Sequence, residues 1–226
     1  VWHDGLRCKL LSSGLPIPAV RWLSDFLRNR RFAVQTGDAY SRWYEMEAGV
    51  PQGSPLSPIL FILFTADMPV GLNPRVSAGV FADDIALWSR SSDLRLAEQR
   101  VQAEVDMVVK WCDRWRLRLN PAKCQAIAFS RHKSALQPRL TIHQEAIPVC
   151  EEVKYLGVTF DRKLNWGTHL TKSIDSARLR LNGLHAACGG RFELSKSTGL
   201  AVYRCLIQFV IEYGCAAWVS AADHLH

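Results

Sequence analysis

The chain has 226 residues, of which 48% are hydrophobic and 22% charged, with a formal net charge of +7. This composition excludes a disordered chain and leaves room for one large domain, or for one domain with a smaller appendage. No apolar run reaches the roughly 18–20 residues of a membrane span, and the first residues carry no signal peptide, so we expect no membrane partner.

The charge distribution and the cysteine pattern indicate which partners and metal sites to expect. Residues 51–92 carry two basic and three acidic side chains, whereas the segments on either side are net basic. A pI near 9.2 favours a polyanionic partner such as nucleic acid, although many proteins without such a partner are mildly basic. The seven cysteines contain no C-x-x-C pair, which favours reduced, buried thiols over a zinc site.

The first third of the chain predicts helices, then strands, then a helix. Residues 6–32 are typical of a helical region with a break at 14–18, and residues 32–50 of strand and turn around Thr36-Gly37-Asp38. A loop rich in proline, glycine and serine follows at 49–58. It leads into an apolar segment, 59–68, that predicts a buried helix.

A hairpin and a long helix are the clearest elements of the sequence. Residues 76–89 alternate between apolar and polar positions on both sides of the turn Phe81-Ala82-Asp83-Asp84, which predicts two short paired strands. Residues 93–119 place apolar side chains three or four positions apart, as a helix requires. Ser91 or Ser92 is expected to cap this helix, and Asn120-Pro121 to end it.

The remaining segments predict strands followed by helices. Strand candidates lie at 125–130, 140–142 and 153–160, and helices at roughly 168–187 and 197–214. This order indicates an α+β body with a small helical second domain.

The adjacent carboxylates of Asp83 and Asp84 are the strongest candidates for chemistry. Two carboxylates between hydrophobic strands repel each other and lose solvation, which costs free energy unless a cation is present. Their hard oxygen donors suit Mg²⁺ or Mn²⁺, and two such ions can activate a 3′-hydroxyl and stabilise a leaving phosphate. The alternative is a solvated turn, in which an Asp-Asp pair is common.

Four ordered motifs together resemble the reverse transcriptase family. They are Val-Pro-Gln-Gly-Ser-Pro-Leu-Ser-Pro at 50–58, Phe-Ala-Asp-Asp at 81–84, Leu-Asn-Pro-Ala-Lys-Cys at 119–124 and Val-Lys-Tyr-Leu-Gly-Val at 153–158. The third is similar to the family's lysine-bearing segment and the fourth to its primer-grip segment. The form of these motifs, with the opening residues 1–6 and the late Ile211-Glu212-Tyr213-Gly214, most resembles the non-LTR, LINE-like retrotransposon enzymes.

The resemblance implies an RNA-directed DNA polymerase that uses two Mg²⁺ or Mn²⁺ ions. Asp83 would be a principal metal ligand, with Asp84 as its supporting neighbour. Lys123 would stand near the incoming triphosphate as a charge stabiliser or proton donor, unless it is an ordinary surface lysine.

The resemblance also assigns residues that bind nucleotide, template and primer. Those on the nucleotide and template side would be Gln52, Gly53, Ser54, Phe81 and Ala82, although 51–58 would serve equally well as a helix-entry loop. Leu156 and Gly157 would form the turn that holds the primer backbone, unless they make a plain hairpin turn. Lys172, Arg178 and Arg180 would be available for backbone phosphates.

At the level of the fold, the resemblance implies a partial polymerase palm at 1–165, with the hairpin as its catalytic turn, and a helical thumb at 166–226. The implied partners are an RNA template, a DNA primer and deoxynucleoside triphosphates, within an intracellular ribonucleoprotein of the nucleus or cytoplasm.

The family's site needs a further aspartate just before the position that matches Val1, and the fingers before that. We therefore expect a fragment that lacks the N-terminal part of its polyprotein, folds poorly or partly alone and does not polymerise. A second hypothesis is a decayed or domesticated derivative that binds nucleic acid without catalysis.

Overall fold

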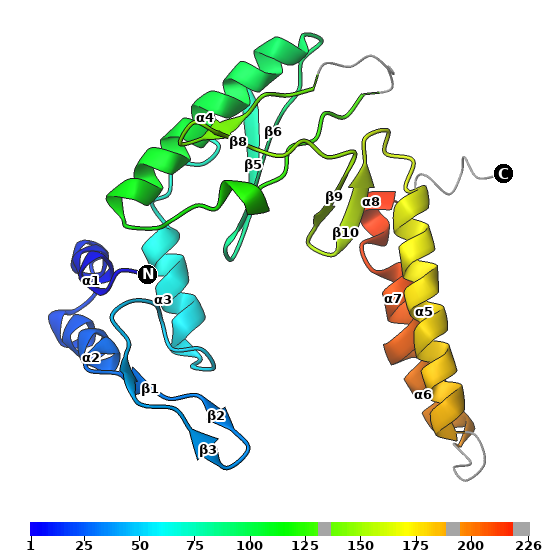
Figure 1. The fold of residues 1–226 in the computed structure, drawn as a ribbon, viewed down its shortest axis with the longest axis horizontal. Helices are drawn as coiled ribbons and strands as arrows, with labels where there is room; N and C mark the ends of the chain where they lie inside the picture. Colours follow the sequence, from blue (N-terminus) through cyan, green and yellow to red (C-terminus); the bar gives the residue numbers. More distant parts are fainter. Residues whose placement is uncertain (131–136, 189–194, 219–226) are drawn as a thin grey trace. The chain divides into compact units, whose positions relative to one another are not determined.

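The computed structural model describes residues 1–130, 137–188 and 195–218 (Figure 1). The chain forms two compact units, the first of residues 1–123 and 139–147, the second of residues 124–138 and 148–226. Helices and strands are mixed, which agrees with the expected α+β class. In the part of the chain that the structure describes, the strands pair only in twos, all antiparallel. The assignment of a palm and a thumb stays a prediction.

The N-terminal elements follow the sequence closely. Helix α1 spans His3–Ser12 and helix α2 spans Ile17–Leu27, separated by the predicted break, where Gly14 has φ +77°. Strand β1 (Arg31–Phe32) pairs with β4 (Tyr44–Glu45), and β2 (Gln35–Thr36) pairs with β3 (Ala39–Tyr40). The predicted turn at 36–38 is therefore the tip of a hairpin.

Helix α3 (Leu56–Thr65) begins three residues before the predicted start at 59 and ends three residues before the predicted end at 68. The prediction placed the start after the last proline. However, the first N–H groups of a helix have no partner within it, so Pro58 is tolerated in the first turn. The helix is also buried on one face only, because Ile59 and Ile62 are exposed whereas Leu60 and Phe64 are buried.

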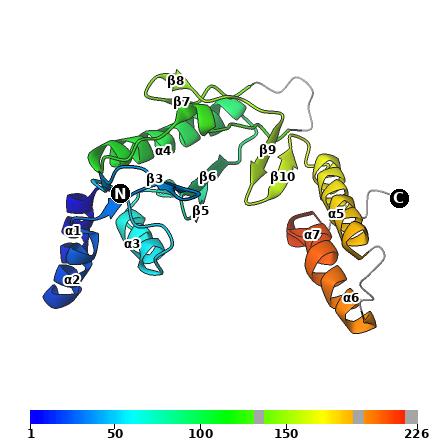
Figure 2. The ribbon, with the colours of Figure 1, turned by 60° about the horizontal axis from the view of Figure 1, so that its bottom comes forward.

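Strands β5 (Val76–Phe81) and β6 (Asp84–Ser89) form the predicted hairpin, with six pairs from Val76↔Ser89 to Phe81↔Asp84. Helix α4 (Leu94–Arg114) follows and packs against this hairpin. Within the first unit, the strands β7 (Thr141–Ile142) and β8 (Glu145–Ala146) form a further hairpin beside α4 (Figure 2).

Both predicted ends of α4 were wrong. The N-cap is Asp93, whose carboxylate accepts the Arg95 N–H at 2.8 Å, while the Ser91 hydroxyl oxygen accepts the Asp93 N–H instead. At the other end the helix stops at Arg114 rather than near 119. Arg116 takes a left-handed conformation, φ +55°, and the Leu117 N–H returns to the Cys112 carbonyl at 2.9 Å.

The core of the first unit joins α1, α2, α3 and α4. Its buried side chains belong to hydrophobic residues of these four helices: Leu6, Leu10, Val20, Leu27, Leu60, Phe64, Val108, Trp111 and Cys112. Lys9 enters the same region, with its ammonium 3.9 Å from the centre of the Trp115 ring and paired with Asp67. Burial lowers the pKa of Lys9, and Asp67 opposes that shift.

The second unit contains the hairpin of β9 (Glu152–Tyr155) and β10 (Val158–Asp161) and a helical tail. Helix α5 (Gly167–Cys188) runs beside a second helical stretch in both views (Figures 1 and 2). That stretch comprises α6 (Lys196–Tyr203), a π-helical segment at Arg204–Gln208 and α7 (Phe209–Glu212), with the short α8 (Cys215–Trp218) after a break.

Two strand predictions in this region need correction. The stretch 153–160 is a hairpin rather than one strand, because Leu156 and Gly157 both have positive φ, +46° and +85°. Residues 125–130 form no strand; their β pairing is a single parallel bridge of Ala126 with Val149, and the Ser130 N–H donates to the Arg162 carbonyl at 3.1 Å. The apolar residues of this segment therefore pack without a continuous hydrogen-bonded neighbour.

Two compositional expectations also change. The segment Ser197–Trp218 is long and apolar enough to cross a membrane by length and composition, contrary to the expectation that no such run exists. Core helices and signal sequences pass the same test, and this helix breaks at Tyr213 and Gly214. The structure describes the side chains of six of the seven cysteines, all as free thiols, but only Cys112 of these is buried, and burial raises its pKa to about 11.

Candidate functional site

The tip of the β5–β6 hairpin presents the four residues of the Phe-Ala-Asp-Asp motif. Phe81 and Asp84 form the last pair of the ladder, so Ala82 and Asp83 make the two-residue turn. Ala82 has φ +52°, a region in which a Cβ costs roughly 1–2 kcal/mol. The surrounding ladder holds this turn against its local preference, as is found at functional sites.

All four residues of the tip are exposed. The expectation of desolvated carboxylates is therefore wrong, because no other element described in the structure covers the tip. The case for a cation therefore rests on two adjacent carboxylates and not on a desolvation cost.

The donor set of this tip fits a hard divalent ion. Mg²⁺ in proteins keeps several waters and binds through one or two carboxylates together with substrate phosphates, so Asp83 and Asp84 supply suitable protein oxygens. In the three described segments, no group of three or more histidine, cysteine, aspartate or glutamate side chains forms a closed metal cage. The pair is thus suited to an ion shared with a phosphate substrate.

The loop at 49–55 is held from both sides. The Gly49 N–H donates to the Val1 carbonyl at 2.7 Å, and the ring of His3 bonds the Gly49 carbonyl at 2.8 Å. After the loop turns, the hydroxyl of Ser57 donates to the carbonyl of the buried Pro51. The anchors leave the outer part of the loop exposed.

Between those anchors lie the three residues expected to line the nucleotide side. Gln52 and Gly53 are exposed and Ser54 is half-buried. Gly53 has φ +84° and open space around the position of a Cβ, so its backbone is accessible to a ligand. Val50, within this loop, and Ile85, after Asp84, pack against the same core cluster, which ties the loop and the hairpin to one framework.

Lys123 lies at the end of a 3₁₀ turn, Pro121–Lys123, in the first unit. Its N–H donates to the Asn120 carbonyl at 3.0 Å and its side chain is exposed. Among the described residues, the structure records no contact between Lys123 and the hairpin tip or the 52–54 loop. Its expected role at the triphosphate stays a prediction.

The basic side chains expected to meet phosphates already have partners. Lys172 forms an ion pair with Glu152 at 3.1 Å, Arg178 one with Asp175 at 3.7 Å, and Arg180 donates to the Leu206 carbonyl at 3.2 Å. The hydroxyl of Thr168 and the ammonium of Lys172 lower the pKa of Glu152. Exposed ion pairs contribute little to stability, so a phosphate can compete for these cations.

The turn at Leu156-Gly157 joins β9 to β10, and both of its residues are exposed. It also makes a contact that the sequence did not predict. Tyr213, from the break after α7, donates its hydroxyl to the Leu156 carbonyl at 2.9 Å. In the sequence, Tyr213 belongs to the Ile-Glu-Tyr-Gly motif at 211–214, which carried a resemblance but no assigned role and did not indicate this contact.

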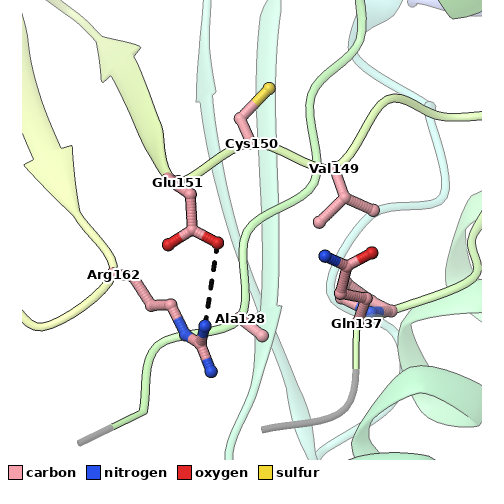
Figure 3. A pocket seen from close by; sticks show the side chains of 7 residues that line it. Ala128, Gln137, Val149, Cys150, Glu151 and Arg162 are labelled. Atoms are coloured by element: carbon pink, nitrogen blue, oxygen red, sulfur yellow. Dashed lines mark ion pairs between the residues drawn. The ribbon is translucent and has the colours of Figure 1, made fainter. Parts of the chain in front are cut away.

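One small pocket lies in the second unit, and none of the residues that line it is an expected site residue (Figure 3). Ala128, Val149 and Cys150 line it, beside an ion pair of Glu151 with Arg162 at 3.7 Å. Its volume of about 10 Å³ has room for one water molecule.

Comparison with known proteins identifies the family. The family model described as "Reverse transcriptase (RNA-dependent DNA polymerase)" matches residues 1–160, the range that contains all four motifs. The chain belongs to the reverse transcriptase family. No solved structure matched the chain.

The relatives of this reverse transcriptase chain are retrotransposon proteins. It is 33% identical over 226 residues to "Probable RNA-directed DNA polymerase from transposon X-element" of Drosophila melanogaster, covering 99% of this chain and 25% of that protein. It is 32% identical over 235 residues to "RNA-directed DNA polymerase from mobile element jockey" of Drosophila funebris, covering 100% and 25%. The expected resemblance to non-LTR retrotransposon RNA-directed DNA polymerases is confirmed, and the chain spans about a quarter of the length of these relatives.

Proposed function

We propose that this chain is the palm and thumb part of a non-LTR retrotransposon reverse transcriptase. Its palm would be residues 1–165 and its thumb 166–226. The reaction is attack of a primer 3′-hydroxyl on the α-phosphate of a deoxynucleoside triphosphate, directed by an RNA template. The observation that supports it is the exposed carboxylate pair, Asp83 and Asp84, at a strained hairpin tip within the family's matched range.

Asp83 would be a principal ligand of two Mg²⁺ or Mn²⁺ ions, and Asp84 would support it electrostatically. When bound, such ions lower the pKa of a hydroxyl nucleophile and neutralise charge on phosphate oxygens. The chain's own contribution is to fix the two carboxylates at the end of a six-pair ladder. Because both side chains are exposed, they meet a phosphate substrate without any rearrangement of the core.

The other residues of the first unit would bind and orient the nucleotide. Gln52, Gly53 and Ser54 would line its base and sugar, where the open backbone at Gly53 permits close approach. Phe81 and Ala82 would complete that surface from the hairpin. Lys123 would stabilise the negative charge that develops on the departing pyrophosphate.

The second unit would hold the duplex of template and primer. The Leu156-Gly157 turn would contact the primer backbone, while Lys172, Arg178 and Arg180 would contact phosphates. Since Lys172 and Arg178 pair with carboxylates in the free chain, each phosphate contact would replace a weak surface ion pair. The affinity for the duplex should therefore fall steeply as salt rises.

The same proposal includes the binding partners and the cellular location of the enzyme. The partners are an RNA template, a DNA primer and deoxynucleoside triphosphates, together with the N-terminal part of the same polyprotein, which would supply a further aspartate and the fingers. The place of action is intracellular, in the nucleus or cytoplasm, as a ribonucleoprotein. The relatives' greater length supports a larger polypeptide around this region.

Primer extension on an RNA template tests this function. The longest available polypeptide that contains this sequence should extend a DNA primer with Mg²⁺ and stop when the metal is chelated, while residues 1–226 alone should bind the duplex without extending it. A polypeptide that binds template and primer but never extends would favour a decayed or domesticated nucleic-acid binder. Robust synthesis by residues 1–226 alone would contradict the expectation of a fragment.

A further inference from the structure

Two turns of the second unit interlock, although 57 residues separate them in sequence. One is the β9–β10 turn at Leu156-Gly157, and the other is the break between α7 and α8 at Tyr213-Gly214. The hydroxyl of Tyr213 donates to the carbonyl oxygen of Leu156 at 2.9 Å. The contact thus joins the tip of a hairpin to the corner of the helical tail.

Each turn also lacks room for a side chain at its glycine. A Cβ on Gly157 would lie 2.8 Å from Cε1 of Tyr213, and a Cβ on Gly214 would lie 2.6 Å from Cγ2 of Val158. Both glycines have positive φ, +85° and +70°. The backbone at each glycine therefore approaches a side chain of the other segment more closely than a residue with a Cβ would permit.

Tyr213 is itself held in place. Trp218 of α8 donates its indole N–H to the Tyr213 carbonyl at 3.1 Å, and the Tyr213 ring lies 6.1 Å from that of Phe209, centre to centre. Beneath the hairpin, the buried His169 of α5 accepts the Thr159 N–H at 3.3 Å. The backbone and the ring of Tyr213 are thus both held by contacts within the helical tail.

The bonded carbonyl is the one that the turn itself leaves free. Tyr155 and Val158 pair across the hairpin, so the ladder closes around Leu156 and Gly157, whose positive φ values are those of a type I′ turn. In such a turn the peptide group between the two central residues has no partner in the ladder. The carbonyl oxygen of this peptide group, that of Leu156, accepts the hydrogen bond from the Tyr213 hydroxyl and would otherwise face water.

Fixing this carbonyl also fixes the other side of the same peptide. In a trans peptide the N–H points opposite to the C=O, so the Gly157 N–H points away from Tyr213. Gly157 is exposed, which leaves that N–H facing solvent. Backbone N–H groups of this kind are common donors to nucleic-acid phosphates.

We propose that Tyr213 is a positioning residue that sets the orientation of the Leu156-Gly157 peptide for contact with the primer backbone. This inference rests on the proposed function, because it assigns a place to a residue in duplex binding. The half-exposed position of Tyr213, 45% by area, suits a role at a binding surface better than a role in core packing.

Removal of one oxygen atom tests the proposal. Tyr213→Phe keeps the ring and deletes only the donor to Leu156. Tyr203→Phe is the matched control, because Tyr203 lies in the same unit, is also 45% exposed and has no hydrogen bond recorded among the described residues. Hydrogen exchange at the Val158 amide, in the ladder next to the turn, should be about three- to tenfold faster in Tyr213→Phe and unchanged in the control.

The same pair of variants, made in the longest available polypeptide, separates positioning from folding. The dissociation constant for a fluorescent RNA–DNA template–primer duplex should rise about three- to tenfold in Tyr213→Phe, and the KM for the deoxynucleoside triphosphate should stay the same. Faster exchange with unchanged duplex affinity would overturn the proposal, and so would unchanged exchange. Duplex affinity needs no synthesis, so a polypeptide without polymerase activity would refute the proposed function alone.

A double-mutant cycle guards against a variant that merely unfolds. Gly157→Ala should weaken duplex binding because the new Cβ meets the Tyr213 ring, and Tyr213→Leu removes that ring. The double variant should therefore bind more tightly than the two separate losses predict. Strictly additive losses would show that the two turns do not act together, and would overturn the proposal.

Discussion

The corner between β10 and α5 depends on one carboxylate. Asp161 accepts three backbone N–H groups, from Lys163 at 2.9 Å, Asn165 at 3.2 Å and Trp166 at 2.9 Å. Leu164 and Trp166 both have positive φ, +55° and +64°, which costs roughly 1–2 kcal/mol at each. The bonds to Asp161 offset this cost and let the Trp166 ring pack 5.3 Å from that of Phe160.

The substitution Asp161→Asn should therefore open this corner. The amide keeps one acceptor oxygen, so the bond to the Trp166 N–H is lost and an NH₂ group faces it. Hydrogen bonds to charged acceptors contribute roughly 1.5–3 kcal/mol each, and the partial exposure of Asp161 reduces that figure. We expect a loss of about 2 kcal/mol, which corresponds to about thirtyfold faster hydrogen exchange at the Trp166 amide.

The charge of Asp161 makes the same corner sensitive to acid. Burial alone would raise the pKa of Asp161, but the N–H donors of Asn165, Trp166 and Lys163 together lower it below its ordinary value of 3.8. The stabilisation is therefore complete above pH 3.8 and is lost as the pH falls through the lowered pKa. Asp161→Asn should lack this dependence.

Asp175→Asn is the matched control, since Asp175 makes only an exposed ion pair with Arg178, at 3.7 Å. It should change the exchange rate at Trp166 by less than about fivefold, because such a pair contributes roughly 0–1 kcal/mol. Equal exchange rates in the two variants would refute the reasoning that Asp161 holds the corner.

Other substitutions test the framework around the site. Phe64→Ala should lower the free energy of unfolding of the first unit by about 3–5 kcal/mol, because Phe64 is fully buried, whereas Ile62→Ala, at an exposed position of the same helix, should cost less than about 0.5 kcal/mol in urea denaturation. Ala82→Gly should raise that free energy by about 1 kcal/mol by relieving the positive φ, and a loss would show that the turn is not strained. Burial lowers the pKa of His169, which accepts the Thr159 N–H as a neutral ring, so the melting temperature of the second unit should fall as the pH drops below about 6.5. A melting temperature that does not differ between pH 7.5 and pH 5 would contradict this last expectation.

Elements with a strong local signal were predictable from the sequence. The hairpin at 76–89 was marked by alternation on both sides of a tight turn, and α4 by a 3.6-residue period over many turns. One of the four reverse transcriptase motifs lies on this hairpin, so the carboxylate pair could be located from the order of residues alone. The solvent exposure of the carboxylate pair could not be predicted, because it depends on which distant elements cover the hairpin tip.

Features that depend on distant partners or on unusual backbone were missed. Arg116 ends α4 in a left-handed conformation without a glycine to mark it. The run at 125–130 has strand composition, yet its β pairing in the described structure is one bridge, between Ala126 and Val149. The contact of Tyr213 with Leu156 spans 57 residues, and no local pattern could predict it.

The central claim is that Asp83 serves the polymerase reaction, and one substitution tests it most directly. Asp83→Asn should lower the rate of primer extension by the longest available polypeptide at least about a hundredfold, with template–primer affinity retained. Asp38→Asn is the matched control, because Asp38 is also the exposed second residue of a two-residue hairpin turn, between β2 and β3, and should leave the rate unchanged. Synthesis by Asp83→Asn at the rate of the control would contradict the account.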